Sequence, residues 1–218
     1  MERKDPFVES EYYHLYNRGV DKRTIFTSPG DHKRFLMLLY LANSNEEIRI
    51  SNILKSNTYE EVFSRERGEP LVSIGAYCLM PNHFHLLLTP RTEGGVSRFM
   101  LKIQTGYSMF FNTKYERSGS LFQGPFKSIR ADTDRYLNYL FAYIHLNPAK
   151  IRERNWKEKV YKRNDLLKFV ESYPYSSYEA YLNNAHIITD PKAFPEYFSS
   201  QEEVRSHITD WLKQKDTE

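Results

Sequence analysis

Two apolar segments separated by only two residues constrain the fold of this 218-residue chain more than any other feature. The segments are residues 71–80 and 83–89. Pro81 and Asn82, which separate them, are residue types that favour tight turns. The sequence therefore predicts two neighbouring strands joined by a hairpin turn.

The alternation of side chains along these strands predicts which face of each strand is buried, because successive side chains on a strand point to opposite faces. In the first strand we expect a core-facing row at the even-numbered positions, Val72, Ile74, Ala76, Cys78 and Met80. In the second strand we expect Phe84, Leu86 and Leu88 to face the core, which leaves His83, His85 and Leu87 on the other face. The two histidines thus share a face that does not belong to the core.

The remaining segments predict an α+β fold. Their patterns indicate a strand within residues 11–27, a helix over 28–41, a helix over 95–115, a strand over 121–131, and a helix that Asp132 caps and Asn147-Pro148 ends. This order is typical of the ferredoxin-like (split βαβ) sandwich, a four-stranded antiparallel sheet with helices on one face. The other face of such a sheet is expected to be open for binding, as in many single-strand nucleic-acid binders.

Two parts of the chain lie outside this pattern. Residues 43–70 are polar and charged, and we interpret them as an insertion that contains a short strand and has room for a helix. We expect one domain over residues 1–182 and a C-terminal helical extension over residues 183–218. In the extension, Ser200 and Glu203 have the spacing of a capping box, and the helix that they begin is expected to pack against the domain.

Composition indicates a folded protein of a reducing compartment. Hydrophobic residues make up 40% of the chain and aromatic residues 15%, which is too much for a disordered protein. The single cysteine, Cys78, excludes an intrachain disulfide and a four-thiolate zinc site. The longest apolar stretch, residues 35–42, is far too short to cross a bilayer. We therefore expect a cytoplasmic protein with no membrane partner.

Basic residues are concentrated in one part of the chain. The net charge is only +3, but residues 121–168 contain eleven Lys or Arg against five acidic residues. Seventeen tyrosines and fourteen phenylalanines accompany this charge, which would suit stacking on unpaired bases and pairing with phosphates. A solvated basic face without a partner explains the charge equally well. Arg18, Lys127 and Arg130 are candidate phosphate contacts.

The pair His83 and His85 is compatible with several kinds of site. A half-exposed strand with two polar positions would explain it without any ligand. Such pairs also occur in zinc and non-haem iron sites. Tyr143 and Asn147 lie four residues apart on the last predicted helix, so they share one of its faces. Two imidazoles and an amide oxygen would suit Mg²⁺ or Mn²⁺ together with an oxygen of a phosphate group, whose phosphorus the Tyr143 phenol could attack.

Five sequence motifs in one order resemble a known family. Residues 76–90, AYCLMPNHFHLLLTP, resemble the HUH signature of the single-tyrosine transposases, and in particular the REP-associated tyrosine transposase branch. The other motifs are HLYNRG at 14–19, GSLFQGPFKS at 119–128, YIHLNP at 143–148 and YPYSSY at 173–178. The resemblance covers residues 11–182.

The resemblance implies an enzyme of DNA transposition. Members of this family cut single-stranded DNA beside a hairpin through a covalent 5′-phosphotyrosine, and they leave a 3′-OH that can reseal the strand. Transferred residue by residue, the nucleophile is Tyr143 and the divalent-metal ligands are His83, His85 and Asn147. Related branches often have glutamine at the last position. Relatives occur as monomers and as dimers that exchange this helix, so the resemblance leaves open a homodimer in which Tyr143 serves the partner's metal.

Alternatives to this interpretation remain at this stage. Tyr107 is the main rival nucleophile, although Phe111, four residues later, cannot bind a metal. His145 is interpreted as structural. The protein could also be a catalytically idle nucleic-acid-binding module, a domesticated relative of the transposases. A small-molecule metallohydrolase is weaker, because no Glu or Asp is evidently placed as its general base.

Overall fold

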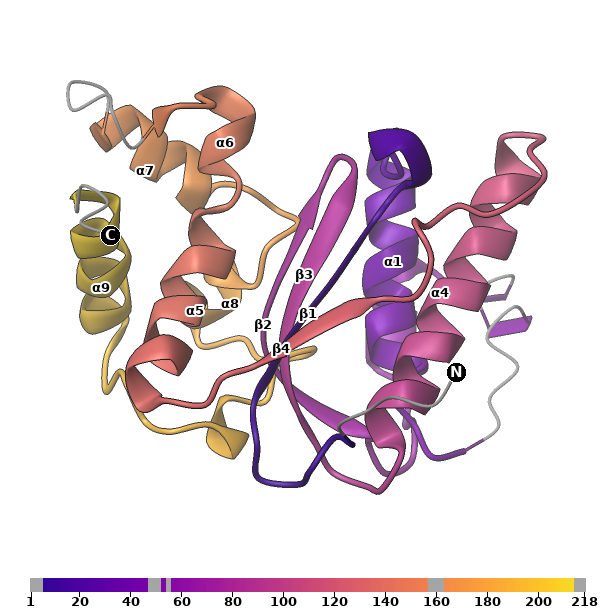
Figure 1. Ribbon diagram of the computed structural model, residues 1–218, viewed down its shortest axis with the longest axis horizontal. Coiled ribbons are helices and arrows are strands. Elements are labelled where there is room, and N and C mark those ends of the chain that lie inside the picture. The colour runs from indigo at the N-terminus through magenta and orange to yellow at the C-terminus, as the bar shows by residue number, and fades with distance from the viewer. Residues whose placement is uncertain (1–5, 47–51, 54–55, 157–162, 214–218) are drawn as a thin grey trace.

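A computed structural model of the protein describes residues 6–46, 52–53, 56–156 and 163–213. Its centre is one four-stranded sheet in the order β2-β3-β1-β4, in which every neighbouring pair is antiparallel. The strands are β1 (Tyr13–Arg18), β2 (Val72–Met80), β3 (His83–Pro90) and β4 (Lys127–Arg130) (Figure 1). The predicted hairpin is confirmed, since Met80 lies opposite His83. The predicted α+β fold class is confirmed as well.

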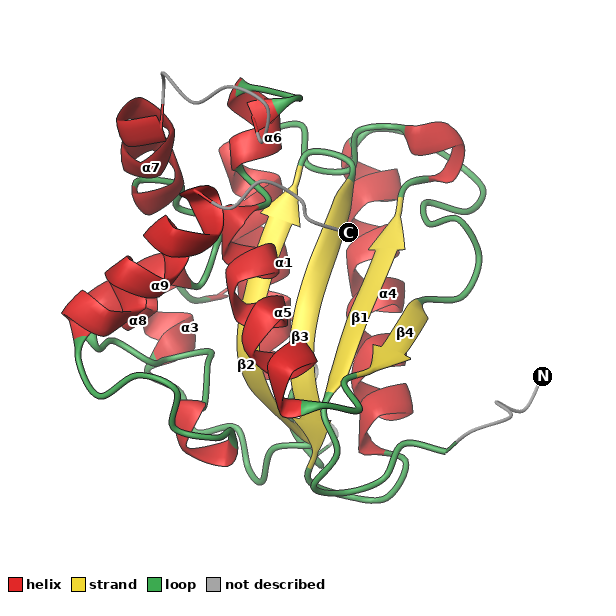
Figure 2. Cartoon of the chain, turned by 60° about the vertical axis from the view of Figure 1, so that its left-hand side comes forward, coloured by secondary structure: helices red, strands yellow, loops and turns green. Residues whose placement is uncertain are grey.

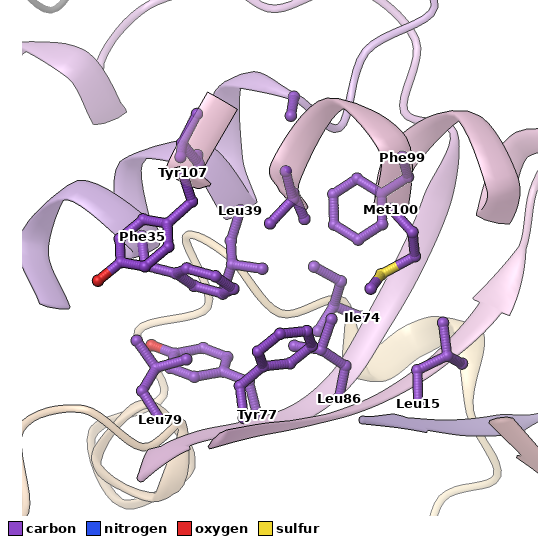
Figure 3. Packing of buried hydrophobic residues seen from close by; sticks show 14 of the residues in the cluster. Leu15, Phe35, Leu39, Ile74, Tyr77, Leu79, Leu86, Phe99, Met100 and Tyr107 are labelled. Carbon is purple, nitrogen blue, oxygen red and sulfur yellow. The ribbon is translucent and has the colours of Figure 1, made fainter. Parts of the chain in front are cut away.

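Two long helices cover one face of the sheet. They are α1 (Pro29–Leu41) and α4 (Gly95–Lys114), within a residue of their predicted bounds. Between them and the sheet lies the main hydrophobic core, in which Phe35, Phe99 and Tyr107 are fully buried (Figure 3). Asp31 joins the two helices, because its carboxylate caps the start of α1 and also accepts hydrogen bonds from Lys114 and Tyr115.

The second face of the sheet is less open than expected. Helix α5 (Asp134–Leu146) packs across β2 and β3 on this face (Figure 2). Its apolar stripe, which includes Leu137, Leu140 and Ile144, is buried there. Only the part of this face over β1 and β4 stays accessible, where Lys127 is exposed and Ile129 is 43% exposed.

Four further helices surround α5 on the same side of the sheet. They are α6 (Ala149–Arg152), α7 (Arg163–Glu171), α8 (Tyr178–Asn183) and α9 (Gln201–Lys213). The predicted packing of α9 is confirmed, because Val204, Ile208 and Leu212 are buried in the same cluster as α5. The described residues also form two short 3-10 helices, Val20–Lys22 and Pro191–Ala193. No helix of the described part of the chain has the length and apolar character needed to cross a membrane.

The predicted apolar face of β2 is wrong for half of the strand. Its register against β3 shifts between Ile74 and Ala76. A shift of one residue reverses every later side chain, so Ala76 packs under α5 and not in the α1/α4 core. Gly75 lies at the shift, where a Cβ would come within 2.7 Å of the Phe194 ring. Both faces of β2 are buried, and alternation could not reveal the bulge.

Two smaller expectations need correction. The strand expected over 121–131 is only the four-residue edge strand β4, because the preceding residues run irregularly and touch Gly19 through a single bridge at Phe122. Helix α5 is capped by Thr133 and not by Asp132, since the Thr133 hydroxyl accepts the Tyr136 N–H.

The insertion at 43–70 contains the short helix α3 (Tyr59–Phe63). Its described residues include no strand, and residues 47–51 and 54–55 lie outside the described part. Lys157, Lys159 and Lys162 of the basic region also lie outside it. The division of the chain at residue 182 stays a prediction, and α8 runs across that position.

Candidate functional site

His83 and His85 lie side by side on the second face of β3, as predicted. Their ring centroids are 4.9 Å apart, and the rings are nearly perpendicular. His85 is buried and His83 is half-buried. Because β3 is an inner strand with partners on both sides, its backbone holds the two imidazoles on a rigid support.

Each of these imidazoles has a hydrogen-bond partner at its Nδ1 atom. The Nδ1 atom of His85 lies 2.8 Å from Nε2 of His14, on strand β1. The Nδ1 atom of His83 lies 2.6 Å from Oδ1 of Asn82, in the hairpin turn. In both rings the Nε2 atom is the nitrogen outside these contacts. Ligating histidines commonly show this arrangement, in which one nitrogen binds a metal and an outer partner holds the other.

Burial keeps the three histidines neutral. Burial lowers the pKa of His14 to about 4. Burial, with the nearby charges of Lys150 and Arg18, lowers the pKa of His83 to about 4. The pKa of His85 lies well below its ordinary value, first because of burial and then because of the neighbouring imidazoles and Lys150. A neutral imidazole has the free lone pair that a metal ion requires.

Tyr143 of α5 lies against the histidines of its own chain. Its ring centroid is 5.5 Å from that of His85 and 5.8 Å from that of His14, edge-on in both cases. Burial raises the pKa of the Tyr143 phenol above its ordinary value, and a hydrogen bond with the Asn147 side chain offsets part of the rise. The phenol is therefore protonated at neutral pH.

Asn147 follows Tyr143 by one helical turn and is buried at the end of α5. Its Nδ2 atom donates to the Tyr143 carbonyl oxygen at 2.8 Å, and its Oδ1 atom accepts from Lys150 Nζ at 3.1 Å. Lys150 also lies over the Tyr143 ring, 5.0 Å from the centroid. Pro148 caps the short helix α6, whose second residue is Lys150. The structure thus brings Tyr143 against His85, and it places Asn147 one turn further along α5, bonded to Lys150, whose charge acts on both His83 and His85.

The sequence interpretation missed three residues of this site. His14 and Tyr16 sit in the first strand, and only the pairing of β1 with β3 places them beside His85. Lys150 was one of eleven basic residues in its region, and its position four residues beyond α5 carried no separate signal.

Of the candidate phosphate contacts, two reach the site face and one does not. Arg18 lies directly opposite His83 in the sheet, and Lys127 lies opposite Tyr16, so both side chains project from the site face. Arg130 lies opposite Tyr13, whose side chain belongs to the other face. Its guanidinium is paired with the carboxylate of Glu11 at 3.4 Å.

Two other candidates are accounted for by packing. Tyr107 is fully buried in the α1/α4 core and donates its hydroxyl to the Ile25 carbonyl oxygen. It lies on the opposite side of the sheet from the histidines. His145 is buried with its Nε2 atom 2.7 Å from Ser177 Oγ, which agrees with its interpretation as structural.

The donor set can accommodate a hard or borderline divalent cation. Among the described residues, no group of three or more His, Cys, Asp or Glu side chains could hold a metal. A site here would instead use two imidazole nitrogens and the amide oxygen of Asn147, whose second lone pair remains beside the bond from Lys150. Imidazole and carbonyl donors together are acceptable to Mn²⁺ and, with more oxygen ligands from water or phosphate, to Mg²⁺.

Comparison with known proteins identifies the family. No curated protein matches the chain. A solved structure, that of a REP-associated tyrosine transposase bound to a REP hairpin, has a similar fold. Its TM-score is 0.52 at 13% sequence identity, over 92% of this chain and 96% of that chain. The family model of the IS200-like transposases matches residues 7–147, which include β1, the histidine pair, Tyr143 and Asn147. The protein therefore belongs to the IS200-like transposase family.

Proposed function

We propose that this protein cleaves and rejoins single-stranded DNA beside a hairpin, in a reaction that depends on a divalent metal and passes through a phosphotyrosine at Tyr143. The observation that carries the proposal is the contact of the Tyr143 ring with His85 in the same chain. In this contact the phenol lies beside the neutral imidazoles of His85 and His14, next to the accessible part of the sheet face. The fold likeness to a hairpin-bound transposase supports the choice of DNA.

Tyr143 would act as the nucleophile in a balanced exchange of phosphate esters. Its phenolic oxygen forms a bond to phosphorus and its proton leaves to solvent. The bond between phosphorus and the 3′ oxygen breaks with its electron pair on that oxygen, which takes up a proton to become a 3′-OH. The 5′-phosphate stays on the tyrosine. The reverse attack by a 3′-OH reseals a strand and restores the phenol.

His83, His85 and Asn147 would hold Mg²⁺ or Mn²⁺ through two Nε2 atoms and Oδ1. When bound, the ion would withdraw charge from the phosphate and offset the charge that develops on the leaving oxygen. All three proposed ligands are neutral. The cation is therefore expected to bind more tightly when a DNA phosphate contributes a charged oxygen, and DNA should bind more tightly with the cation by the same factor.

Two cations mark where a phosphate would lie. Lys150 and Arg18 both lower the pKa of His83, so both charges are close to the site. Lys150 also lies over the Tyr143 ring, where a cation stabilises a phenolate. Lys127 extends the positive charge along β4, on the uncovered part of the sheet face. We propose that the unpaired strand crosses β1 and β4 to reach Tyr143.

Covalent capture of labelled DNA tests the proposal. A pool of hairpin oligonucleotides, incubated with Mg²⁺ or Mn²⁺, should give a protein–DNA adduct that survives denaturation. Sequencing the released strand should place the attachment at a 5′-phosphate. Tyr143→Phe should reduce the adduct to background because it removes the nucleophilic oxygen.

Tyr139→Phe is the matched control for this experiment. Tyr139 lies on the same helix, and its ring is 5.7 Å from that of Tyr143, so this variant removes a neighbouring hydroxyl only. It should form the adduct at the normal rate. An adduct that persists in Tyr143→Phe would contradict the proposed nucleophile. Hairpin binding without an adduct under either metal would favour the idle binding module.

A further inference from the structure

We infer that Asn82 and His14 are positioning residues that hold His83 and His85 in the same tautomer, with the proton on Nδ1 and the lone pair on Nε2. This inference deepens the proposed function, since it rests on both imidazoles serving as metal ligands. It assigns roles to two residues that are proposed neither as metal ligands nor as the nucleophile.

The tautomer of His83 follows from the hydrogen bonds of Asn82. The Asn82 side chain lies between His83 and the backbone of the loop after β1. One end of its amide contacts the Lys22 carbonyl oxygen at 3.1 Å. A carbonyl oxygen can only accept, so this end is the NH₂ group and the other end is Oδ1. Oδ1 in turn can only accept from His83 Nδ1, 2.6 Å away, which must therefore carry the proton.

The loop that orients Asn82 is itself held in an unusual backbone conformation. Asp21 and Lys22 have φ angles of 55° and 59°, in the left-handed region that residues with side chains rarely adopt. Such conformations persist where surrounding contacts hold them in place. Here the Gly19 N–H donates to the Asn82 carbonyl oxygen at 2.9 Å, next to the Asn82 to Lys22 bond. The loop and the hairpin turn thus form one connected unit beside His83.

His14 can play the corresponding role for His85. Their facing nitrogens are 2.8 Å apart, so one of them carries a proton and the other accepts it. If His85 donates from Nδ1, its Nε2 keeps a lone pair and matches His83. If His14 donates, the proton of His85 sits on Nε2 and only one imidazole could bind a metal through that atom. Metal binding by both imidazoles through Nε2 therefore requires His14 to be the acceptor.

A direct shared-ligand role for His14 conflicts with this geometry. A metal held between two imidazole nitrogens at about 2.0–2.1 Å from each would keep the nitrogens more than 2.8 Å apart in a tetrahedral site. His14 also stands one strand away from the hairpin that carries His83 and His85. Its position is that of an outer partner that orients a ligand.

Nitrogen NMR of the metal-free protein tests the inference without any DNA. Two-bond ¹⁵N–¹H correlation at pH 8 distinguishes the two neutral tautomers of each histidine. We expect the Nδ1–H pattern for both His83 and His85. An Nε2–H pattern at either residue would overturn the inference for that residue's partner.

Metal affinity gives a second readout, with Mn²⁺ as the probe and electron paramagnetic resonance of the free ion as the measurement. His14→Phe keeps an aromatic ring but removes the acceptor, and Asn82→Ala removes the amide. Each should weaken Mn²⁺ binding by roughly 10-fold to 100-fold. His14→Gln, which offers an amide oxygen, should recover most of the affinity. Unchanged affinity in both His14→Phe and Asn82→Ala would contradict a positioning role.

Two controls separate this inference from folding and from the proposed function. His186→Phe alters a histidine that is bonded to Thr189 away from the site, and it should leave Mn²⁺ affinity unchanged. If His14→Phe fails to fold, the wild-type spectrum and His14→Gln decide the question. Absence of any DNA adduct in wild type would remove the proposed function and leave the tautomer assignment standing. Nε2–H tautomers together with normal adducts would overturn the tautomer assignment and leave the proposed function standing.

Discussion

The two faces of strand β3 differ in chemistry although their residues alternate one by one. Phe84, Leu86 and Leu88 are fully buried against α1 and α4. His83 and His85 point to the other face, where they meet Asn82, His14 and Tyr143. The first face needs only shape and apolar surface, whereas the second depends on particular nitrogen atoms. One strand therefore holds the site rigidly because its other face is part of the main core.

The covering of the two faces differs as well. On the α1/α4 face the core extends under β2, β3 and β1, whereas on the other face α5 covers β2 and β3 but leaves β1 and β4 accessible (Figure 2). The histidine pair lies at this boundary. It is buried enough for its pKa values to fall and still lies next to an open surface. A site at the edge of the area that α5 covers therefore combines neutral imidazoles with access for a ligand.

The largest expected effect is a difference in the free energy of unfolding between variants on the two faces of β3. Phe84→Ala should lower the free energy of unfolding by about 3–5 kcal/mol, because it leaves a cavity in the main core. His83→Ala, one residue away on the site face, should change it by less than about 1 kcal/mol while DNA adducts are lost. Urea denaturation and adduct assays on both variants check this. Similar losses of stability in the two variants would contradict the division of roles.

Acidification should destabilise the protein through the buried His14 of the site face. Burial lowers the pKa of His14 to about 4, so between pH 6.5 and 4 the unfolded chain binds a proton that the folded chain does not. Stability is therefore full above pH 6.5 and falls as the pH drops to 4, by roughly 3 kcal/mol for this residue. Urea denaturation as a function of pH measures the loss, and His14→Phe should remove this part of it.

Asp31 provides the comparison on the core face. Burial raises the pKa of Asp31. Hydrogen bonds from Lys114, Tyr115 and two backbone N–H groups lower it by more than burial raises it, so the net pKa is below the ordinary value of 3.8. Its contribution is present above pH 3.8 and is lost only as the pH falls below that value. Asp31→Asn should therefore remove the loss of stability below pH 3.8, which urea denaturation at low pH measures. A loss of the same size in this variant would contradict the contribution of Asp31.

A smaller effect is expected for the cation beside the nucleophile. Lys150→Met should slow adduct formation by about 10-fold, equivalent to about 1.4 kcal/mol, because the variant removes the charge that stabilises the phenolate and the phosphate. Single-turnover adduct formation at saturating DNA measures the rate. Lys168→Met, which removes an exposed charge on α7, is the control and should react normally. Equal rates for both variants would exclude Lys150 from the reaction.

The smallest effect compares two charges of one strand that point to opposite faces. Lys127→Ala should reduce the slope of log affinity against log salt for hairpin DNA by roughly 0.7–0.9, because one phosphate contact is lost. Arg130→Ala should leave that slope unchanged, because Arg130 faces away from the site and pairs with Glu11. Fluorescence anisotropy at several salt concentrations measures both. The reverse result would place the DNA on the other face of the sheet.

Local pattern was enough to predict much of this fold. The turn at Pro81-Asn82, the cap and apolar stripe of α1, and the alternation of β3 each depend on residues close in sequence. The two faces of β3 were therefore predictable, and with them the common face of His83 and His85. Helix α5 was predictable for the same reason, apart from its capping residue.

What the sequence did not reveal depends on contacts between distant segments. The bulge in β2 fits the ring of Phe194, more than a hundred residues away. The cover over the second sheet face comes from α5 and from helices beyond it, which periodicity alone cannot assign to a face. His14 joins the site only through the register of β1 against β3. Tertiary pairing, and not local propensity, decided each of these.

The packing of α5 has a consequence for how ends of a cut strand would be exchanged. Leu137, Leu140 and Ile144 fix this helix between the sheet and α9, and His145 is hydrogen-bonded to Ser177. A 5′ end attached to Tyr143 would accordingly stay where it was captured. The folded DNA, rather than a moving protein segment, would then have to deliver the new 3′ terminus. Under the proposed reaction, choice of the joining partner becomes a property of hairpin geometry.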